Sequence, residues 1–258
     1  MTICDYRISG APLDSAPVLM LIHGIGASKH TWDGLLAHMP PSYTYVSYDL
    51  RGHGNSFLPE IPFGLQELVD DVEALRAHLK IEHIHLAGHS LGGMIGPAYA
   101  KQYPQHTLSV GLLSTAAGRT VEDSAKVNGL VKLLAEQGAE PVLEALINRW
   151  FTDEFAAQNP QVIAQRKRQV LDTPADVFLQ VFDIYANTEM APWLKTVKSP
   201  CLVLTGAQDG GCNPRLNRFI DSQLDNSQLV ILENLKHAIL LEAPARVAQS
   251  LIQFLAHI

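Results

Sequence analysis

The chain has 258 residues, of which 47% are hydrophobic and 17% charged, and its formal net charge at pH 7 is −7. These values are ordinary for a globular protein with a large core, and single α/β domains often reach about 250 residues. The acidic balance argues against nucleic-acid binding, which requires a basic face.

Short apolar runs alternate with longer helical patterns along most of the chain. Strands are predicted for residues 17–24, 43–52, 83–88, 108–115, 200–206 and 227–234. Leu65–Leu79 carries apolar residues at spacings of three and four, which predicts an amphipathic helix, and residues 94–103 and 245–258 are also predicted to be helical. This alternation predicts an α/β fold with a mostly parallel central sheet and helices on both faces.

One region interrupts the alternation. Residues 119–192 contain no convincing strand but hold helical segments at 127–138, 140–151, 160–171 and 174–187. A block of helices inserted between two strands predicts a cap over one end of the sheet. We therefore expect a core formed by residues 1–118 and 193–258 and a helical cap, or lid, formed by residues 119–192.

A single serine lies among glycines where one predicted strand meets a helix. Residues 88–92 read Gly-His-Ser-Leu-Gly, the pattern G-x-S-x-G in the strand–turn–helix context of a nucleophile elbow. The turn is so sharp that the residues two before and two after the serine carry no side chain. Ser90 is therefore the predicted nucleophile, and the free amide of Leu91 is predicted to face the negative charge that forms on a substrate.

A serine nucleophile needs a base, and the base needs an orienting acid. After such an elbow the order is serine, acid, histidine. Asp209 and His237 each lie just past a predicted strand, so both side chains should reach the same carboxyl edge of the sheet as Ser90. Asp209 is therefore the predicted acid and His237 the predicted base.

Other residues of the right type are placed less well for these roles. Rival carboxylates, none directly after a strand, are Asp183, Asp221 and Asp225. His89 is adjacent to Ser90 but is expected to point away from it, and His53 is expected at the surface or in a loop. His83 and His85 alternate on a strand without nearby carboxylate or cysteine ligands, so no metal site is predicted.

The first long strand is followed by the sequence His-Gly-Ile-Gly. Its turn is predicted to leave the backbone N–H of Ile25 facing the serine. With the Leu91 N–H this makes an oxyanion hole of two donors, each typically worth ~3 kcal/mol. A simple glycine turn is the alternative interpretation.

Five segments together resemble the α/β-hydrolase superfamily. They are "HGIG", "YDLRGHGNS", "GHSLGG", "TGAQD" and "NLKHAILLEAP", in order and over nearly the whole chain. The resemblance implies the same nucleophile, acid and base, namely Ser90, Asp209 and His237. More narrowly, "LLSTAAG" and "INRWFTDEF" are similar to 3-oxoadipate enol-lactonases and related lactonases and esterases. In that family a cationic residue soon after "TAA" helps to hold a carboxylate; here Arg119 follows Gly118.

Four residues are candidates for contact with a substrate. Trp32 comes just after the oxyanion loop, whereas Arg119, Arg149 and Trp150 lie in the predicted cap. An arginine there can bind a carboxylate through two hydrogen bonds. The alternative is that the arginines are solvated or pair with an acidic neighbour in the cap, and that Trp150 serves packing.

These features predict a serine hydrolase that cleaves a small carboxylic ester or lactone and needs no cofactor. Hydrolysis of a C–C bond in a diketone and perhydrolysis are alternatives on the same triad. A ligand receptor that retains the fold is an alternative of another class. The predicted partner is a small-molecule substrate; the oligomeric state stays open.

The cysteines and the N-terminus bear on the compartment. Cys4, Cys201 and Cys212 are far apart in the sequence, which favours a reducing compartment over a disulfide framework. The first residues show no basic region followed by an apolar run, and Val18–Ile22 is too short to cross a bilayer. A cytoplasmic protein without membrane contact is expected.

Overall fold

A seven-stranded sheet forms the centre of the protein in the computed structural model, which describes residues 2–258. The strands are β1 (Tyr6–Gly10), β2 (Val18–Ile22), β3 (Thr44–Tyr48), β4 (Ile84–His89), β5 (Thr107–Leu113), β6 (Cys201–Gly206) and β7 (Ser227–Leu232). Their order across the sheet is β1-β3-β2-β4-β5-β6-β7, with β1 antiparallel to β3 and the other pairs parallel. The predicted fold class is confirmed.

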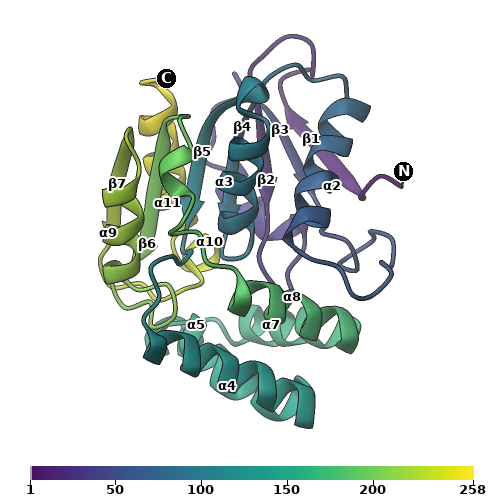
Figure 1. Ribbon diagram of the computed structural model, residues 1–258, viewed down its shortest axis with the longest axis vertical. Helices are drawn as coiled ribbons and strands as arrows, with labels where there is room; N and C mark the ends of the chain where they lie inside the picture. The colour runs from purple at the N-terminus through teal and green to yellow at the C-terminus, as the bar shows by residue number, and fades with distance from the viewer. Residues whose placement is uncertain (1) are drawn as a thin grey trace.

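Helices cover both faces of this sheet (Figure 1). Side chains of α2 (Leu65–His78), α3 (Gly92–Gln102) and α9 (Pro214–Gln223) join the core on one face. Those of α1 (Asp33–Leu36), α10 (Ile239–Glu242) and α11 (Pro244–Leu255) join the core on the other. All five residues of β2 are buried, because alternate side chains enter the two cores, so the strand reads as a continuous apolar run.

The chain between β5 and β6 is helical and lies across one end of the sheet (Figure 1). It forms α4 (Val121–Gln137), α5 (Leu143–Trp150), α6 (Asp153–Gln158), α7 (Pro160–Asp172) and α8 (Ala175–Asn187). We propose that this segment, residues 119–192, acts as the cap. Its helix α4 starts six residues before the predicted start, because Thr120 and Asp123 form a capping box.

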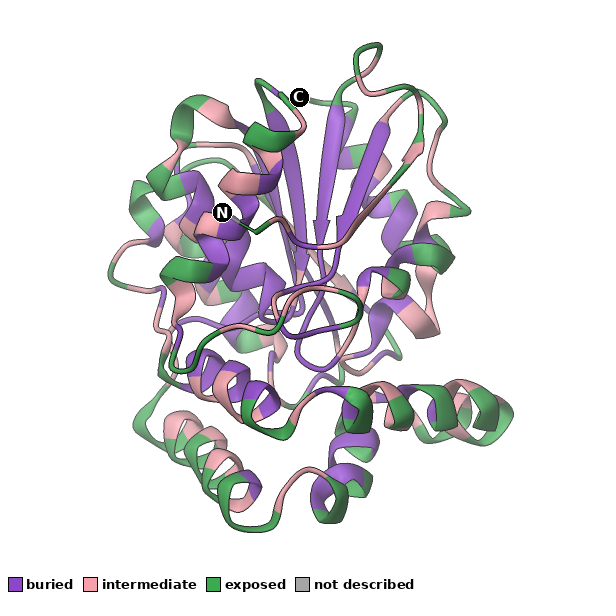
Figure 2. Ribbon diagram, turned by 90° about the vertical axis from the view of Figure 1, so that its right-hand side faces the viewer, coloured by how far each residue is buried: buried purple, intermediate pink, exposed green. Residues whose placement is uncertain are grey.

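Short 3-10 helices connect several of these elements. They are η1 (Lys29–Trp32), η2 (Pro104–His106), η3 (Glu140–Val142) and η4 (Leu194–Thr196). Figure 2 shows that the inner strands are buried, whereas the cap helices carry buried residues mixed with exposed ones. Within residues 2–258, no helix combines the length and apolarity needed to cross a membrane.

Strand β1 lies outside the predicted strands. It is an edge strand of five residues whose side chains are only partly buried. Its sequence, YRISG, therefore lacks the continuous apolar run that identifies the inner strands. Its place at the edge depends on pairing with β3, from Tyr6 opposite Tyr48 to Gly10 opposite Thr44.

Candidate active site

Ser90 occupies a sharp turn between β4 and α3. Its φ is 57°, in the left-handed region that residues with a side chain seldom adopt. A Cβ on Gly88 would lie 1.9 Å from the Gly92 carbonyl oxygen, and a Cβ on Gly92 would lie 2.2 Å from the Ile22 carbonyl oxygen. Only glycine fits at both positions. The local backbone is therefore that of the nucleophile elbow that the sequence pattern predicts.

Asp209 and His237 form a hydrogen-bonded pair at the ends of β6 and β7. His237 Nδ1 donates to Asp209 Oδ2 at 2.7 Å, and Asp209 is only 2% exposed. The other carboxylate oxygen, Oδ1, accepts the backbone N–H groups of Gly211 at 2.9 Å and Cys212 at 2.8 Å. With Nδ1 protonated by this bond, Nε2 is the nitrogen of His237 that is free to accept a proton.

The pair shifts the pKa values of both partners. Burial favours neutral forms, but for His237 it is outweighed by the Asp209 charge and hydrogen bond, which raise the pKa of the imidazole above its ordinary 6.5. Burial likewise opposes ionisation of Asp209, yet His237 and the two amides lower the pKa of this carboxyl below 3.8. The buried carboxylate is therefore ionised near neutral pH and stabilises a protonated His237.

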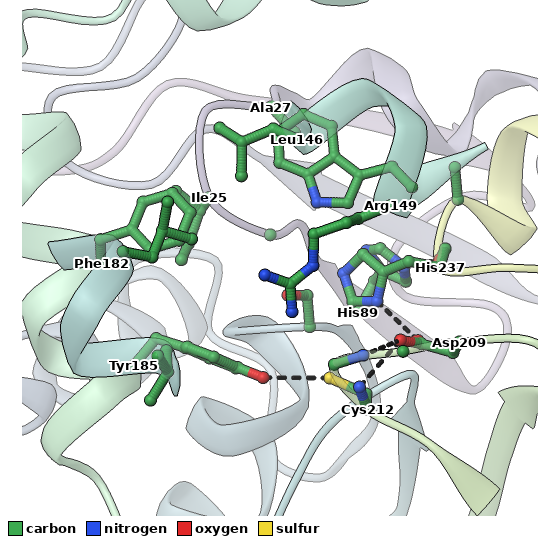
Figure 3. Close-up of a pocket in the computed structure, with 18 of the residues that line it drawn as sticks. Ile25, Ala27, His89, Leu146, Arg149, Phe182, Tyr185, Asp209, Cys212 and His237 are labelled. Atoms are coloured by element: carbon green, nitrogen blue, oxygen red, sulfur yellow. Dashed lines mark hydrogen bonds and ion pairs between the residues drawn. The ribbon is translucent and has the colours of Figure 1, made fainter. Parts of the chain in front are cut away.

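Ser90, Asp209 and His237 line one cavity of about 140 Å³. Figure 3 shows His237, Asp209 and Cys212 together at one side of it, with Phe182 and Tyr185 of α8 on another. Among the described residues, no hydrogen bond joins the Ser90 hydroxyl to His237. Such catalytic bonds often form fully only with substrate in place, so a shared cavity is the relevant geometric condition.

His89 also lines the cavity. Its Nε2 donates to the backbone carbonyl of His237 at 2.9 Å, and the two rings lie 4.9 Å apart. Burial lowers the pKa of His89 to about 3, so it is a weak base. The contact supports the backbone that carries His237.

The loop after β2 packs directly against the elbow. A Cβ on Gly24 would lie 3.0 Å from the Ser90 Cβ, so glycine permits this close approach. Within residues 2–258, neither the Ile25 N–H nor the Leu91 N–H donates to an acceptor of the protein. Two backbone donors near the serine are thus uncommitted, as an oxyanion hole requires.

Two buried histidines hold this loop, and sequence reasoning did not find either of them. His23 Nδ1 donates to the Gly24 carbonyl at 2.7 Å, and its Nε2 accepts the Leu50 N–H at 2.9 Å. His53, expected at the surface or in a loop, lies in a loop but is only 1% exposed; its Nε2 accepts the Gly26 N–H at 3.1 Å. Burial lowers the pKa of His23 to about 3 and that of His53 to about 4, so both remain neutral and their tautomers are fixed.

Three of the four predicted contact residues, Arg119, Arg149 and Trp150, line the cavity. Arg119 Nη1 donates to the carbonyls of Tyr185 and Thr188, both at 3.0 Å, rather than to an acidic side chain. Arg149 is exposed, and no ion pair involving it occurs within the described part of the chain. Trp150 is half-buried, with the Arg166 Cζ 4.6 Å from its ring centre.

Trp32 lies elsewhere, so the expectation that it contacts a substrate is wrong. Its side chain is fully buried in the core between the sheet and α11, beside Leu35. The preceding residue, Thr31, lines the cavity instead. Both residues belong to the 3-10 helix η1, in which the Thr31 side chain lines the cavity and the Trp32 side chain enters the core beside α11.

Three side chains at the acid loop have the composition of a metal site. Ligand atoms of Asp209, Cys212 and His237 lie within 4.8 Å of one another. Asp209 and His237 already share a hydrogen bond, and the Cys212 sulfur lies 3.1 Å from the Tyr185 hydroxyl (Figure 3). These hydrogen bonds explain why the three side chains lie together and require no metal ion between them. Cys212 itself is only 1% exposed.

Arg166 is a cavity residue that sequence reasoning missed. It lies on α7 and donates to the carbonyls of Ile25 and Gly26. A signal was present in the sequence, because Ile163, Arg166 and Val170 share the buried face of the helix at spacings of three and four. Arg166 is the charged residue among the buried residues of this helix.

Comparison with known proteins identifies the fold family. A profile described as the alpha/beta hydrolase fold matches residues 17–244. The chain is 28% identical over 235 residues to 3-oxoadipate enol-lactonase 2 of Acinetobacter baylyi, covering 90% of this chain and 87% of that one. It is 24% identical over 271 residues to monoacylglycerol lipase ABHD6 of Bos taurus, covering 98% and 79%.

A solved structure extends the likeness to three dimensions. The enol-lactonase from Burkholderia xenovorans superposes with a TM-score of 0.87 at 25% identity, covering 98% of this chain and 96% of that chain. The sequence profile covers most of the chain. The sharp turn at Ser90, the Asp209–His237 pair and the sheet order are consistent with the same fold. The protein therefore belongs to the α/β-hydrolase fold family.

Proposed function

We propose that the protein is a serine hydrolase that cleaves a small carboxylic ester or lactone through an acyl-enzyme. The observation that carries the proposal is the 2.7 Å Asp209–His237 hydrogen bond beside a serine held at φ 57° in the same cavity. One relative is named an enol-lactonase and another a monoacylglycerol lipase, which supports ester-bond hydrolysis.

In the proposed reaction His237 Nε2 takes the proton of Ser90 as Oγ attacks the substrate carbonyl carbon. The N–H groups of Ile25 and Leu91 stabilise the oxyanion, and a donor of this kind is typically worth ~3 kcal/mol. The tetrahedral intermediate then expels the alkoxy oxygen, which receives the proton from Nε2. Water, deprotonated by His237, hydrolyses the acyl-enzyme and regenerates Ser90.

The size of the cavity supports a small substrate. Its volume is about 140 Å³. An enclosed cavity of about 150 Å³ accommodates a molecule the size of benzene. A lactone ring or a short acyl group fits this scale, with the rest of the molecule toward the opening.

The charges of the cavity support a carboxylate on that substrate. The charged groups lining it are Arg119, Lys126, Arg149 and Arg166 against Asp123 and Asp209. Both carboxylates are engaged, Asp123 with Arg215 and Asp209 with His237. The cavity is therefore cationic although the whole chain carries −7. We propose Arg149, exposed at the cavity, as the group that meets the carboxylate.

A fluorophosphonate probe tests the nucleophile. Wild-type protein is expected to be labelled, as is the control Ser222→Ala, which alters an exposed serine. Ser90→Ala is expected to remain unlabelled. A wild-type protein with a folded circular dichroism spectrum and no labelling would refute the assignment of Ser90.

A substrate panel then separates the activities that share a triad. Aryl esters, lactones and ring-fission diketones should be compared by kcat/KM, with turnover expected for the first two. Preference for the diketones would indicate a C–C bond hydrolase instead. Peroxide-dependent formation of a peracid would indicate perhydrolysis, and ligand binding without turnover would indicate a receptor.

A further inference from the structure

We propose that Arg166 of cap helix α7 is a positioning residue for the oxyanion hole, because its guanidinium fixes the loop that presents the Ile25 amide. The proposal rests on the proposed serine hydrolase function, since it concerns the same site. It implies that the cap does more than enclose the substrate: its docking completes the catalytic geometry.

The guanidinium of Arg166 is bound by the oxyanion loop and not by an acid. Nη2 donates to the Ile25 carbonyl at 2.8 Å, and Nη1 donates to the Gly26 carbonyl. Arg166 is 9% exposed, and no carboxylate forms an ion pair with it in the part of the chain that the structure describes. Burial of a cation without a counter-ion is unfavourable. Here the carbonyls of Ile25 and Gly26 compensate the unfavourable burial of the Arg166 cation.

The peptide plane between Ile25 and Gly26 is consequently held at both edges. Arg166 binds its carbonyl at 2.8 Å, and His53 Nε2 accepts its N–H at 3.1 Å. The preceding peptide is held through the Gly24 carbonyl, which accepts from His23 Nδ1 at 2.7 Å and from the Ala27 N–H at 3.3 Å. Its N–H, that of Ile25, is the one left free for an oxyanion. Rotation of either plane would move this donor.

Two further contacts of the cap lie close to the Ile25–Gly26 loop and link its conformation to the position of the cap. A Cβ on Gly26 would lie 2.7 Å from the Phe178 ring of α8, so the helix rests on the loop backbone. The Arg166 Cζ lies 4.6 Å from the Trp150 ring centre of α5, within cation–π range. Arg166 of α7, with Trp150 of α5 beside its guanidinium, thus binds two carbonyls some 140 residues earlier in the chain, and Phe178 of α8 packs on the same loop.

Arg166→Ala tests the proposal, with Arg168→Ala as the matched control. Arg168 lies on the same helix but is exposed. On a neutral aryl acetate, Arg166→Ala is expected to lower kcat about 100-fold, because a displaced oxyanion donor acts in the transition state. KM is expected to change much less, and Arg168→Ala should match wild type. Millimolar ethylguanidinium should restore part of the lost kcat.

Other outcomes overturn the proposal. An unchanged kcat would do so, as would a rise in KM confined to carboxylate-bearing esters, which would make Arg166 a substrate contact. If Arg166→Ala does not fold, Arg166→Lys is compared instead; it retains a cation but not the fork that reaches both carbonyls, so kcat is again expected to fall.

Hydrogen exchange separates this proposal from the proposed function. The amides of residues 23–29 are expected to exchange faster in Arg166→Ala than in wild type and in Arg168→Ala, whether or not the protein hydrolyses any ester. Unchanged exchange would overturn the positioning role. Absence of fluorophosphonate labelling in wild type would instead overturn the hydrolase, and the exchange result would stand independently.

Discussion

At the scale of single residues, the site depends on neighbouring groups that set the protonation states of its acidic and histidine side chains. Asp209 accepts one imidazole N–H and two backbone N–H groups, so each of its oxygens has an assigned donor. His89 is next to Ser90 in sequence, yet burial lowers its pKa to about 3. His237, 147 residues from Ser90, is the stronger base because Asp209 raises its pKa. We therefore propose His237 as the base on its ionic environment, although His89 is closer to Ser90 in sequence.

Asp209→Asn should abolish most activity without unfolding the protein. The amide NH2 would face His237 Nδ1 and favour the tautomer that carries its proton on Nε2, where the base must be free. By analogy with the same change in other triads, kcat is expected to fall about 10⁴-fold. Steady-state kinetics with circular dichroism measure this. Asp172→Asn, at an exposed position, is the control, and near-normal activity of Asp209→Asn would place the acid elsewhere.

The pH dependence of kcat/KM should reflect the raised pKa of His237. The imidazole must be neutral to take the Ser90 proton, and Asp209 favours its protonated form. Activity is therefore lost as the pH falls below this raised pKa, about tenfold per pH unit. The midpoint of the acid limb is expected above 6.5 on a neutral ester. A plateau that persists well below pH 6.5 would contradict the raised pKa.

At the scale of elements, the site is made of strand ends and of the turns that follow them. β2, β4, β6 and β7 run parallel, so their carboxyl ends bring together the loop after β2, the turn that carries Ser90, and the proposed acid and base. Each turn requires a close backbone approach. Gly88 and Gly92 are therefore necessary for the turn itself, and these glycines are what made the motif visible in the sequence.

Two glycine substitutions should change stability in opposite directions. Gly88→Ala would place a Cβ 1.9 Å from the Gly92 carbonyl oxygen, so backbone must move; a loss of about 3 kcal/mol in the free energy of unfolding is expected. Gly129 lies in α4 with nothing within 4 Å of its Cβ position. Gly129→Ala should raise stability by about 0.5–1 kcal/mol through helix propensity. Urea unfolding measures both. Equal stability of Gly88→Ala and wild type would contradict the tight elbow.

Sequence patterns predicted those elements whose identity is local. The inner strands are apolar runs, and the elbow is a five-residue motif in its strand–helix context. β1 escaped prediction because an edge strand is only half-buried and is defined by its partner. Trp32 was misplaced because a 3-10 helix directs Thr31 to the cavity and Trp32 to the core behind it. Neither the formation of β1 nor the burial of Trp32 can be predicted from a few neighbouring residues in the sequence.

At the scale of the whole molecule, the contacts between cap and core were the least predictable. Arg166 sits in the run Arg-Lys-Arg, which in isolation is typical of a solvated helix face. Its burial depends on carbonyls from the other end of the chain. Tyr185 similarly joins α8 to the acid loop through Cys212. The proposed cap therefore contacts both the loop after β2 and the loop that carries Asp209, so on the proposed mechanism its position bears on the oxyanion donor and on the acid.

The contrast between a cationic cavity and an acidic chain gives a last prediction, on substrate charge. A substrate carboxylate would meet Arg149, whose exposed guanidinium has no ion pair within residues 2–258. Arg149→Gln should raise KM for a carboxylate-bearing ester about tenfold, as expected for one partly solvated charged hydrogen bond. The methyl ester of the same compound should be affected much less.

Ionic strength provides an independent check of that prediction. At 0.15 M salt the screening length is about 8 Å, so KM of wild type for the anionic ester should rise with added salt, whereas KM for the neutral ester should not. Arg149→Gln should reduce this salt dependence, and Arg168→Gln, an exposed cap arginine that does not line the cavity, should leave it unchanged. Equal effects of Arg149→Gln on KM for the two esters would mean that Arg149 shapes the cavity but does not bind the substrate carboxylate. Loss of packing would affect both substrates, whereas loss of a counter-charge would affect only the anionic one.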